Sequence, residues 1–241
     1  MCFTVSIYAT THVIETDVGA VFDDADAYTA YYHVNGFVHP NLPIITNDRP
    51  DAIQVMAWGL VPRWAKDSAA ADEIRTKTLN ARAETIFEKP SFRDAAKHRR
   101  ALLPVNGFVE WRHDGGIKQP YLLEAADSHL LTLGCLWEEW TCRGTGEIRH
   151  TFSIITTEAN DLLSWVHNAK QRMPVVIPAA ARAVWLADSD REVVTTLMRP
   201  LDEGILKATP VDRAMSRIKV NTDNAELLAP VGPTFFEPPQ S

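Results

Sequence analysis

Hydrophobic residues along the chain recur in short runs that alternate with polar positions, as half-buried β-strands do. From residue 101 onward several such runs follow one another, separated by turn sequences rich in Gly, Pro and Lys. We expect these runs to pair as an antiparallel sheet. The runs are ALLPV (101–105), GFVEW (107–111), PYLLEA (120–125), HLLTLGCLWEEW (129–140) and HTFSIITT (150–157), with further strands predicted at 3–9, 52–58 and 173–177.

Between the strands, helix start signals predict a few short helices. Ser91 with Asp94 suggests a capped helix over 91–100, and Pro178 suits the first turn of another over 178–187. Further helices are expected at 21–31, at 160–166, and from Ser189 or Asp190 to Met198. The pattern predicts a single α+β domain over residues 1–230, with a curved, mainly antiparallel sheet or barrel-like core, followed by a loosely held proline-rich tail over 231–241.

Composition narrows the class of protein. The 241 residues are 46% hydrophobic, yet no apolar run approaches the roughly 20 residues that span a bilayer, and no signal peptide is evident. We therefore expect a cytoplasmic protein without membrane contact. The three cysteines, Cys2, Cys135 and Cys142, show no CxxC or Cys/His ligand spacing, so neither a disulfide framework nor a metal site nor another cofactor is predicted.

The net charge of −7 argues against indiscriminate binding along duplex DNA. Residues 75–100 differ from the rest, because eight basic and three acidic residues there give a local charge of +5 and leave −12 for the remainder. Such a basic face on an acidic body suits a protein that binds a few phosphates at one place. A solvated helix face would carry the same pattern, so charge alone leaves both interpretations open.

Cys2 directly follows the initiator methionine. If Met1 is removed, Cys2 becomes a 1,2-aminothiol, which can trap an aldehyde as an imine and then close to a thiazolidine. At pH 7 an α-amine is roughly 14% neutral and a lysine amine roughly 0.04%, which favours the terminal amine as nucleophile. The alternative is that Cys2 is a small apolar residue at the start of a strand.

Four segments in this order carry a family resemblance: Met1-Cys2, NARAET (80–85), PVNGFVEW (104–111), and His167 followed by RMPVVI (172–177). Together with WGLVPRW (58–64), KQPYLL (118–123) and the PVDRA and VN segments near 210–221, the chain resembles the SOS response-associated peptidase family over nearly its whole length. Members of that family are abasic-site processing proteins that join an N-terminal cysteine covalently to the ring-opened sugar of an abasic site in single-stranded DNA.

The resemblance implies a role for four residues. Cys2 would be the nucleophile, Asn80 would contact the lesion, Glu110 would lie beside the reacting amine, and His167 would assist sugar opening and reversal of the crosslink. Taken singly, the last three could be a cap asparagine, an outward strand glutamate and a structural histidine. Strand cleavage by β-elimination (lyase activity) and a role in the SOS response to DNA damage would accompany this function. Met1 would be removed either by an aminopeptidase or by the protein itself.

The expected partner is single-stranded DNA with abasic sites, bound by a monomer that associates with the nucleoid after DNA damage. Two arginines inside the matched motifs, Arg82 and Arg172, are the preferred phosphate ligands. Trp64 and Trp58 lie in the segment where the family presents apolar side chains to the bases, so the resemblance implies stacking, which tolerates any sequence. The alternative for Trp58 is a place in the core. Weaker candidates for DNA contact are Lys89, Arg93 and Lys219.

Three departures separate this chain from the family pattern. The chain begins MCFT where family members commonly begin MCGR, so an arginine beside the cysteine is missing. Four residues separate His167 from Arg172, a longer spacing than the compact HDRMP form. The segment YYHVNGF (31–37) replaces the more usual YNVAP, which suggests that the first loop contacts DNA differently.

Two other functions stay open from the sequence. In a cysteine hydrolase or self-processing peptidase, the Cys2 thiol would attack an amide with His167 or the α-amine as base. A non-catalytic single-strand binder would use the same basic face and would not need Cys2.

Overall fold

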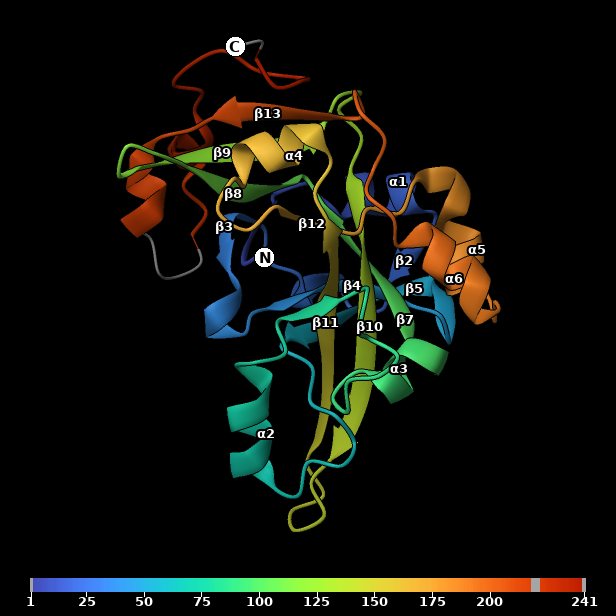
Figure 1. Ribbon diagram of the computed structural model, residues 1–241. Coiled ribbons are helices and arrows are strands. Elements are labelled where there is room, and N and C mark those ends of the chain that lie inside the picture. Colours follow the sequence, from blue (N-terminus) through green and yellow to red (C-terminus); the bar gives the residue numbers. More distant parts are fainter. Residues whose placement is uncertain (1, 218–221, 240–241) are drawn as a thin grey trace.

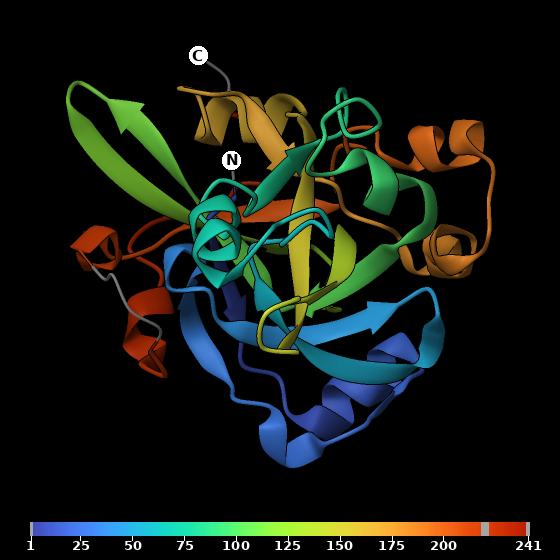
Figure 2. The same ribbon diagram turned by 90° about the horizontal axis from the view of Figure 1, so that it is seen from below.

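The computed structural model describes residues 2–217 and 222–239, and its core is a closed five-stranded barrel that packs against a second sheet (Figures 1 and 2). Neighbouring barrel strands are antiparallel except β11 and β5, which pair in parallel at Thr151–Ala57 and Phe152–Trp58. An odd number of strands cannot alternate in direction all the way round, so one parallel pair has to close the ring. In order around the barrel the strands are β5 (Arg49–Trp58), β4 (Asn41–Thr46), β7 (Arg100–Val105), β10 (Leu131–Thr141) and β11 (Ile148–Glu158).

Three short strands extend the barrel wall. The strand β2 (Val21–Phe22) lies parallel to β5, β6 (Asn80–Arg82) lies parallel to β11, and β12 (Arg172–Pro174) lies antiparallel to β11. These additions matter for function, because β6 and β12 carry two of the motifs that resemble the family.

The second sheet is antiparallel throughout. In spatial order its strands are β13 (Leu206–Pro210), β9 (Ile117–Ala125), β8 (Gly107–Asp114), β1 (Thr4–Ile7) and β3 (Tyr31–Asn35). Side chains of this sheet and of the barrel meet in one hydrophobic core, in which Phe108 and Leu123 of the sheet join Leu103 and Phe152 of the barrel. The first strand of the chain thus lies inside the sheet, with a neighbour on each side.

Short helices surround these two layers (Figure 1). None of the helices in the described part of the chain is long and apolar enough to cross a membrane. The α-helices are α1 (Thr11–Val18), α2 (Ser68–Arg75), α3 (Arg93–His98), α4 (Asp161–Val166), α5 (Arg182–Leu186) and α6 (Arg191–Leu197). The 3-10 turns are η1 (Ala25–Ala27), η2 (Gly36–Val38), η3 (Ala179–Ala181), η4 (Arg213–Arg217) and η5 (Ala225–Leu228).

The predicted fold class, an α+β domain on a barrel-like antiparallel core with short peripheral helices, is confirmed. The helix expected at 21–31 is wrong: Val21 and Phe22 pair with β5, and the Asp24 side chain caps only the single turn η1. The helix expected at 91–100 exists over Arg93–His98, but Phe92 precedes it without a side-chain cap bond, so Ser91 does not cap it.

The tail after residue 230 is held more closely than the sequence predicts. The Val231 N–H donates to the Pro210 carbonyl at 2.9 Å, and Phe235 pairs with Ala208 of β13 through two backbone hydrogen bonds. The Phe235 ring lies 5.0 Å from the Trp165 ring, measured between centroids. A proline-rich composition does not predict this docking, which depends on backbone pairing with β13 and on one aromatic ring.

Candidate active site

Cys2 directly precedes β1 and is fully buried in the core between the sheet and the barrel. Its thiol Sγ lies 3.8 Å from the Thr4 carbonyl oxygen. Burial, and secondly the neighbouring Glu110 carboxyl, raise the pKa of the Cys2 thiol well above its ordinary value. The thiol is therefore protonated at neutral pH.

Glu110 lies on β8, the strand that pairs with β1 through Val5–Phe108 and Ser6–Gly107. This register brings the carboxyl to the beginning of β1. Only 2% of Glu110 is exposed, and burial raises its pKa from 4.5 to about 8. Desolvation disfavours the charged carboxylate, so Glu110 is mostly protonated at pH 7.

His167 ends helix α4, whose start is fixed by Asn160, since the Asn160 Oδ1 accepts from the Leu163 N–H at 3.0 Å. The His167 Nδ1 lies 2.9 Å from the Arg172 carbonyl oxygen and 3.5 Å from Glu110 Oε2. Burial lowers the pKa of His167 to about 4, which keeps the ring neutral at pH 7. Because a carbonyl can only accept, Nδ1 carries the hydrogen and Nε2 keeps a lone pair.

Asn80 begins β6 and is placed by pairing with Ile154 of β11. Its Nδ2 donates a 2.9 Å hydrogen bond to the Cys2 carbonyl oxygen. Its Oδ1 is buried and has no hydrogen-bond partner among the described residues. Asn80 therefore fixes the backbone of the cysteine and offers a free acceptor at the same place.

Cys2, Asn80, Glu110 and His167 thus meet at one place, although they come from four segments of the chain. The proximity that the resemblance implies is present, and their chemical roles remain predictions. Among the residues that the structure describes, no three His, Cys, Asp or Glu side chains lie together as a metal site requires.

The structure also shows how His167 is held. Asn168 Oδ1 accepts from the His113 N–H at 3.0 Å, and Asn168 Nδ2 donates to the His113 carbonyl at 2.8 Å. The Arg112 guanidinium donates to the Trp165 carbonyl and lies over the Trp165 ring. These contacts tie α4 and the residue after His167 to β8. No local sequence signal could have found them, because the partners are more than fifty residues apart.

The candidates for DNA contact differ in their availability. Arg172 is buried, and its guanidinium donates to the Glu84 carboxylate and, at 2.7 Å, to the Thr156 carbonyl. Both terminal nitrogens of the guanidinium donate within the protein, and Nε is buried. Direct phosphate binding by Arg172 stays a prediction that this arrangement does not favour. Exposed candidates are Arg82, Lys89, Arg93 and Trp64, and Lys219 lies outside the described residues.

Trp58 requires a correction. The sequence predicts that it stacks on bases, but its indole is fully buried, stacks on Phe152 and donates to the Leu79 carbonyl at 2.8 Å. Trp64, by contrast, is 51% exposed and donates to the Pro90 carbonyl at 3.1 Å. Of the two tryptophans, only Trp64 presents a ring surface to solvent.

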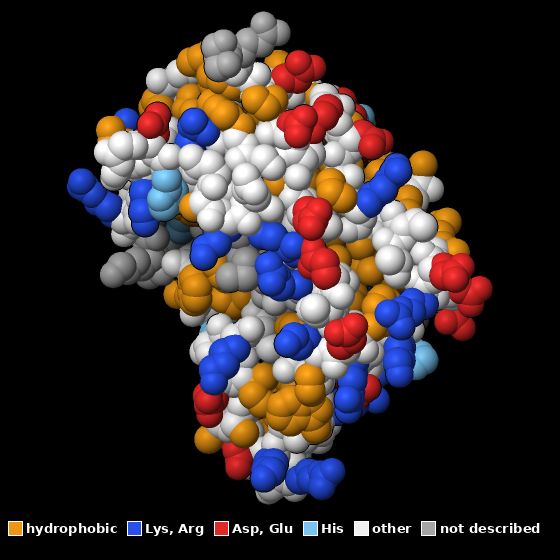
Figure 3. All heavy atoms as spheres, in the orientation of Figure 1, with side chains coloured by type: hydrophobic (Ala, Val, Ile, Leu, Met, Phe, Trp, Pro, Cys, Tyr) orange, Lys and Arg blue, Asp and Glu red, His pale blue; other side chains and the backbone are white. Residues whose placement is uncertain are grey.

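The basic stretch 75–100 does not form one exposed face. Arg100 is buried and donates to the Trp185 carbonyl at 2.8 Å, and Arg99 pairs with the buried Glu138 at 2.7 Å. The other basic residues of this stretch are not set apart from the basic residues elsewhere in the chain. Figure 3 shows Lys and Arg side chains gathered across the middle of one face, between the upper sheet and α2.

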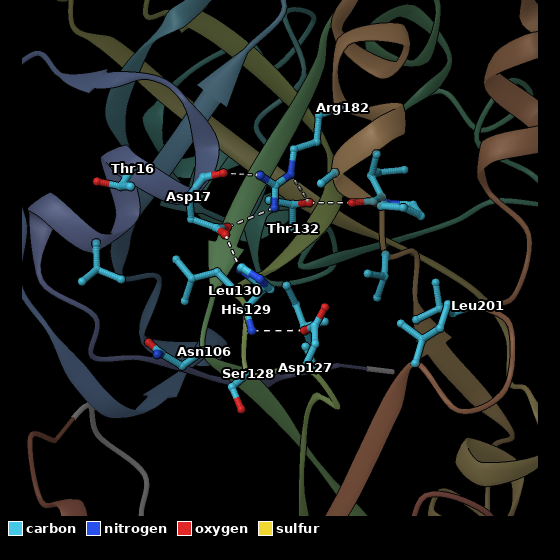
Figure 4. A pocket seen from close by; sticks show the side chains of 18 of the residues that line it. Thr16, Asp17, Asn106, Asp127, Ser128, His129, Leu130, Thr132, Arg182 and Leu201 are labelled. Atoms are coloured by element: carbon cyan, nitrogen blue, oxygen red, sulfur yellow. Dashed lines mark hydrogen bonds and ion pairs between the residues drawn. The ribbon is translucent and has the colours of Figure 1, made fainter.

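A cavity of about 870 Å³ lies elsewhere, between α1, the start of β10 and α5 (Figure 4). In it Arg182 donates to the Asp17 carbonyl at 2.6 Å and to Thr132 Oγ1 at 3.1 Å. None of the four candidate catalytic residues lines this cavity. The chemistry expected from the sequence is therefore not located there.

Comparison with known proteins identifies the family of the chain. The family described as SOS response associated peptidase (SRAP) matches residues 1–218. The Abasic site processing protein YoqW of Bacillus subtilis is 33% identical over 197 residues, covering 79% of this chain and 84% of its own. The Abasic site processing protein HMCES of Gallus gallus is 30% identical over 198 residues, covering 73% of this chain and 56% of its own.

Solved structures give the same answer for the fold. A crystal structure of a protein from Bacteroides thetaiotaomicron superimposes with a TM-score of 0.90 at 34% identity, covering 95% of this chain and all of its own. A protein from Bordetella bronchiseptica, 21% identical, shares the fold with a TM-score of 0.75 over 88% of this chain and all of its own. With a family match over nearly the whole length and relatives above 30% identity, the chain belongs to the SOS response associated peptidase family.

Proposed function

We propose that the protein acts in DNA repair by capturing abasic sites in single-stranded DNA as a covalent thiazolidine on Cys2, after removal of Met1. The relatives named as abasic site processing proteins support this class of substrate. The observation that carries the proposal is the meeting of the Cys2 backbone, held by Asn80 at 2.9 Å, with the Glu110–His167 pair at 3.5 Å.

The reaction balances without a cofactor. The Cys2 amine attacks C1′ of the ring-opened sugar and gives a carbinolamine, which loses one water to form an imine. The thiol then adds to the same carbon, forming a C–S bond while its proton passes to the nitrogen. A protonated thiol suits this last step, and the raised pKa of Cys2 supplies it. Holding both nucleophiles on one buried residue gives the second step a high effective concentration.

Glu110 serves as the proton donor in water loss. With a pKa of about 8 it is mostly protonated at neutral pH, and it can protonate the departing hydroxyl of the carbinolamine. The carboxylate that remains can accept the proton released from nitrogen. A carboxyl with the ordinary pKa of 4.5 would be ionised and could not begin this cycle.

His167 and Asn80 serve the sugar. The neutral His167 ring, with its hydrogen on Nδ1, keeps a basic Nε2 that can take the C1′ hydroxyl proton and so open the closed sugar. The same group assists hydrolysis when the crosslink reverses. The unpartnered Asn80 Oδ1 can accept a hydrogen bond from a sugar hydroxyl. The imine also acidifies the neighbouring sugar carbon, so a minor β-elimination activity is expected.

The protonation states of Cys2 and His167 fit a cysteine hydrolase less well. Such enzymes use a thiolate, commonly beside an imidazolium that lowers the thiol pKa. Here burial raises the pKa of Cys2 and lowers that of His167 to about 4, so both groups are held in their neutral forms.

Two variants and the wild-type protein test the proposal on an abasic oligonucleotide, analysed on a denaturing gel. Wild-type protein should form a band that survives denaturation without reduction. Cys2→Ala and Cys2→Ser should both lose that band and should give one only after borohydride, because both residues retain the α-amine but lack the thiol. Equal band intensity for wild type and Cys2→Ala would reject the proposal and leave a different nucleophile.

A further inference from the structure

Two of the departures from the family pattern meet in space beside Cys2. Phe3, in the MCFT start, and Phe37, in the YYHVNGF segment, have ring centroids 4.8 Å apart with planes tilted by 36°. They come together because β1 pairs with β3 through Thr4 and Asn35. In Figure 3 hydrophobic side chains gather where Figure 1 draws the turn after β3.

The Phe37 ring is exposed, and yet its backbone is rigidly held. Phe37 is 57% exposed, whereas Phe3 is partly buried against the core. The Gly36 N–H donates to the Phe3 carbonyl at 2.9 Å, and Asn35 Oδ1 accepts from the Phe37 N–H at 3.0 Å. The exposed Phe37 ring and the Phe3 ring behind it therefore form one aromatic surface whose backbone is held beside Cys2.

The turn that carries Phe37 rests on the buried Trp58. A Cβ added to Gly36 would lie 3.1 Å from three atoms of the Trp58 ring, so a larger residue would push the turn and the ring apart. The role of Trp58 is thus to support the turn from below, with its indole fixed by the Leu79 carbonyl. A tryptophan predicted to stack on bases instead supports a phenylalanine that is free to do so.

We propose that Phe37, backed by Phe3, stacks on an unpaired base next to the abasic residue. The inference rests on the proposed function, since it takes Cys2 as the point of attachment. Phe3 directly follows Cys2, and consecutive Cα atoms are about 3.8 Å apart, so a nucleotide next to a sugar held on Cys2 is within reach of the aromatic pair in this proposal. Every base has a π-face, and stacking on an aromatic ring therefore needs no particular sequence.

The platform of Phe3 and Phe37 determines which substrates bind well. An abasic residue with ordinary neighbouring bases can use the platform of Phe3 and Phe37, whereas one flanked by further abasic residues cannot. A base that is already paired in a duplex is stacked on its own neighbours and is less available. The platform thereby favours single-stranded DNA without reading sequence.

The test measures equilibrium binding of an oligonucleotide with a tetrahydrofuran residue, an abasic analogue that lacks the aldehyde. Phe37→Ala should weaken binding roughly 5- to 150-fold, the range for loss of one base–aromatic stack. Phe37→Trp should retain the affinity, and Phe236→Ala, at a phenylalanine 48% exposed in the tail, should not change it. On an oligonucleotide whose flanking residues are also tetrahydrofuran, Phe37→Ala and wild type should bind alike.

A fluorescent base gives a second measurement. 2-Aminopurine beside the tetrahydrofuran residue should be quenched on binding to wild type and less quenched on binding to Phe37→Ala at saturation. Equal affinities for wild type and Phe37→Ala, or an equal loss on both oligonucleotides, would overturn the platform. The covalent reaction plays no part here, so failure of the proposed function shows separately, as absence of a crosslink on a natural abasic site.

Discussion

Replacement of Glu110 by glutamine tests whether this carboxyl is buried and protonated, as the site requires. Burial raises its pKa from 4.5 to about 8 in the folded protein. Between these values the folded state keeps a proton that the unfolded chain has released. The wild-type protein therefore loses stability as pH rises from 4.5 to about 8, and a glutamine at this position does not titrate.

The magnitude follows from the pKa shift. Within this window the free energy of unfolding of wild type should fall by about 1.4 kcal/mol per pH unit relative to Glu110→Gln. In a chain of this size each kcal/mol shifts Tm by about 2–4 °C, so the two melting curves should separate by roughly 3–6 °C per pH unit. Below pH 4.5 both states are protonated, and the stabilising contribution is fully present.

The assay is thermal unfolding of wild type and Glu110→Gln at pH 5, 6, 7 and 8, followed by circular dichroism. Glu88→Gln, at an exposed carboxyl, is the matched control and should run parallel to wild type. Other titrating groups cancel in the comparison because the variants share them. Parallel pH dependence of wild type and Glu110→Gln would refute the reasoning, since Glu110 would then be ionised in the folded state.

Three further predictions concern the same site. The rate of crosslink formation, measured in stopped time courses, should have a bell-shaped pH dependence. It should rise as the α-amine loses its proton and fall about tenfold per pH unit above about pH 8 as Glu110 ionises. Glu110→Gln should react slowly and should lack the fall above pH 8. Asn80→Ala removes the bond to the Cys2 carbonyl and should cost about 1 kcal/mol in denaturant unfolding and slow crosslinking, while an unchanged rate would contradict its positioning role. Arg172→Lys cannot reproduce the fork to Glu84 and Thr156 and should lower stability by about 1–3 kcal/mol in the same assay, and a fully stable lysine variant that loses only DNA affinity would instead support phosphate binding.

Local patterns predicted much of the fold. The hydrophobic runs of β10 and β11, and the short helix α4, depend on neighbouring residues and are visible in the sequence. Closure of the barrel by the parallel β11–β5 pair is different, because its partners are almost a hundred residues apart and no local signal connects them. The helix expected at 21–31 was wrong because of a similar distant contact, since Val21 and Phe22 pair with β5 as a strand.

The candidate site was predicted from motifs rather than from physical patterns. Resemblance placed Asn80, Glu110 and His167 with Cys2, but their pKa shifts come from burial, which only the assembled core determines. The exposure of individual side chains was the hardest property to predict, because a tryptophan in a motif can face either the core or the solvent. Trp58 is buried by Gly36 and Phe152, which lie far from it in the sequence.

Intact-mass analysis tests the central claim most directly, with the full-length protein and a single-stranded oligonucleotide made abasic by a uracil glycosylase. The account predicts protein lacking Met1 and a new species whose mass equals that protein plus the oligonucleotide minus one water. Proteolysis should place the added mass on Cys2, and Cys2→Ala should form no such species. An adduct mapped to a lysine, or no adduct from protein that has lost Met1, would contradict the account.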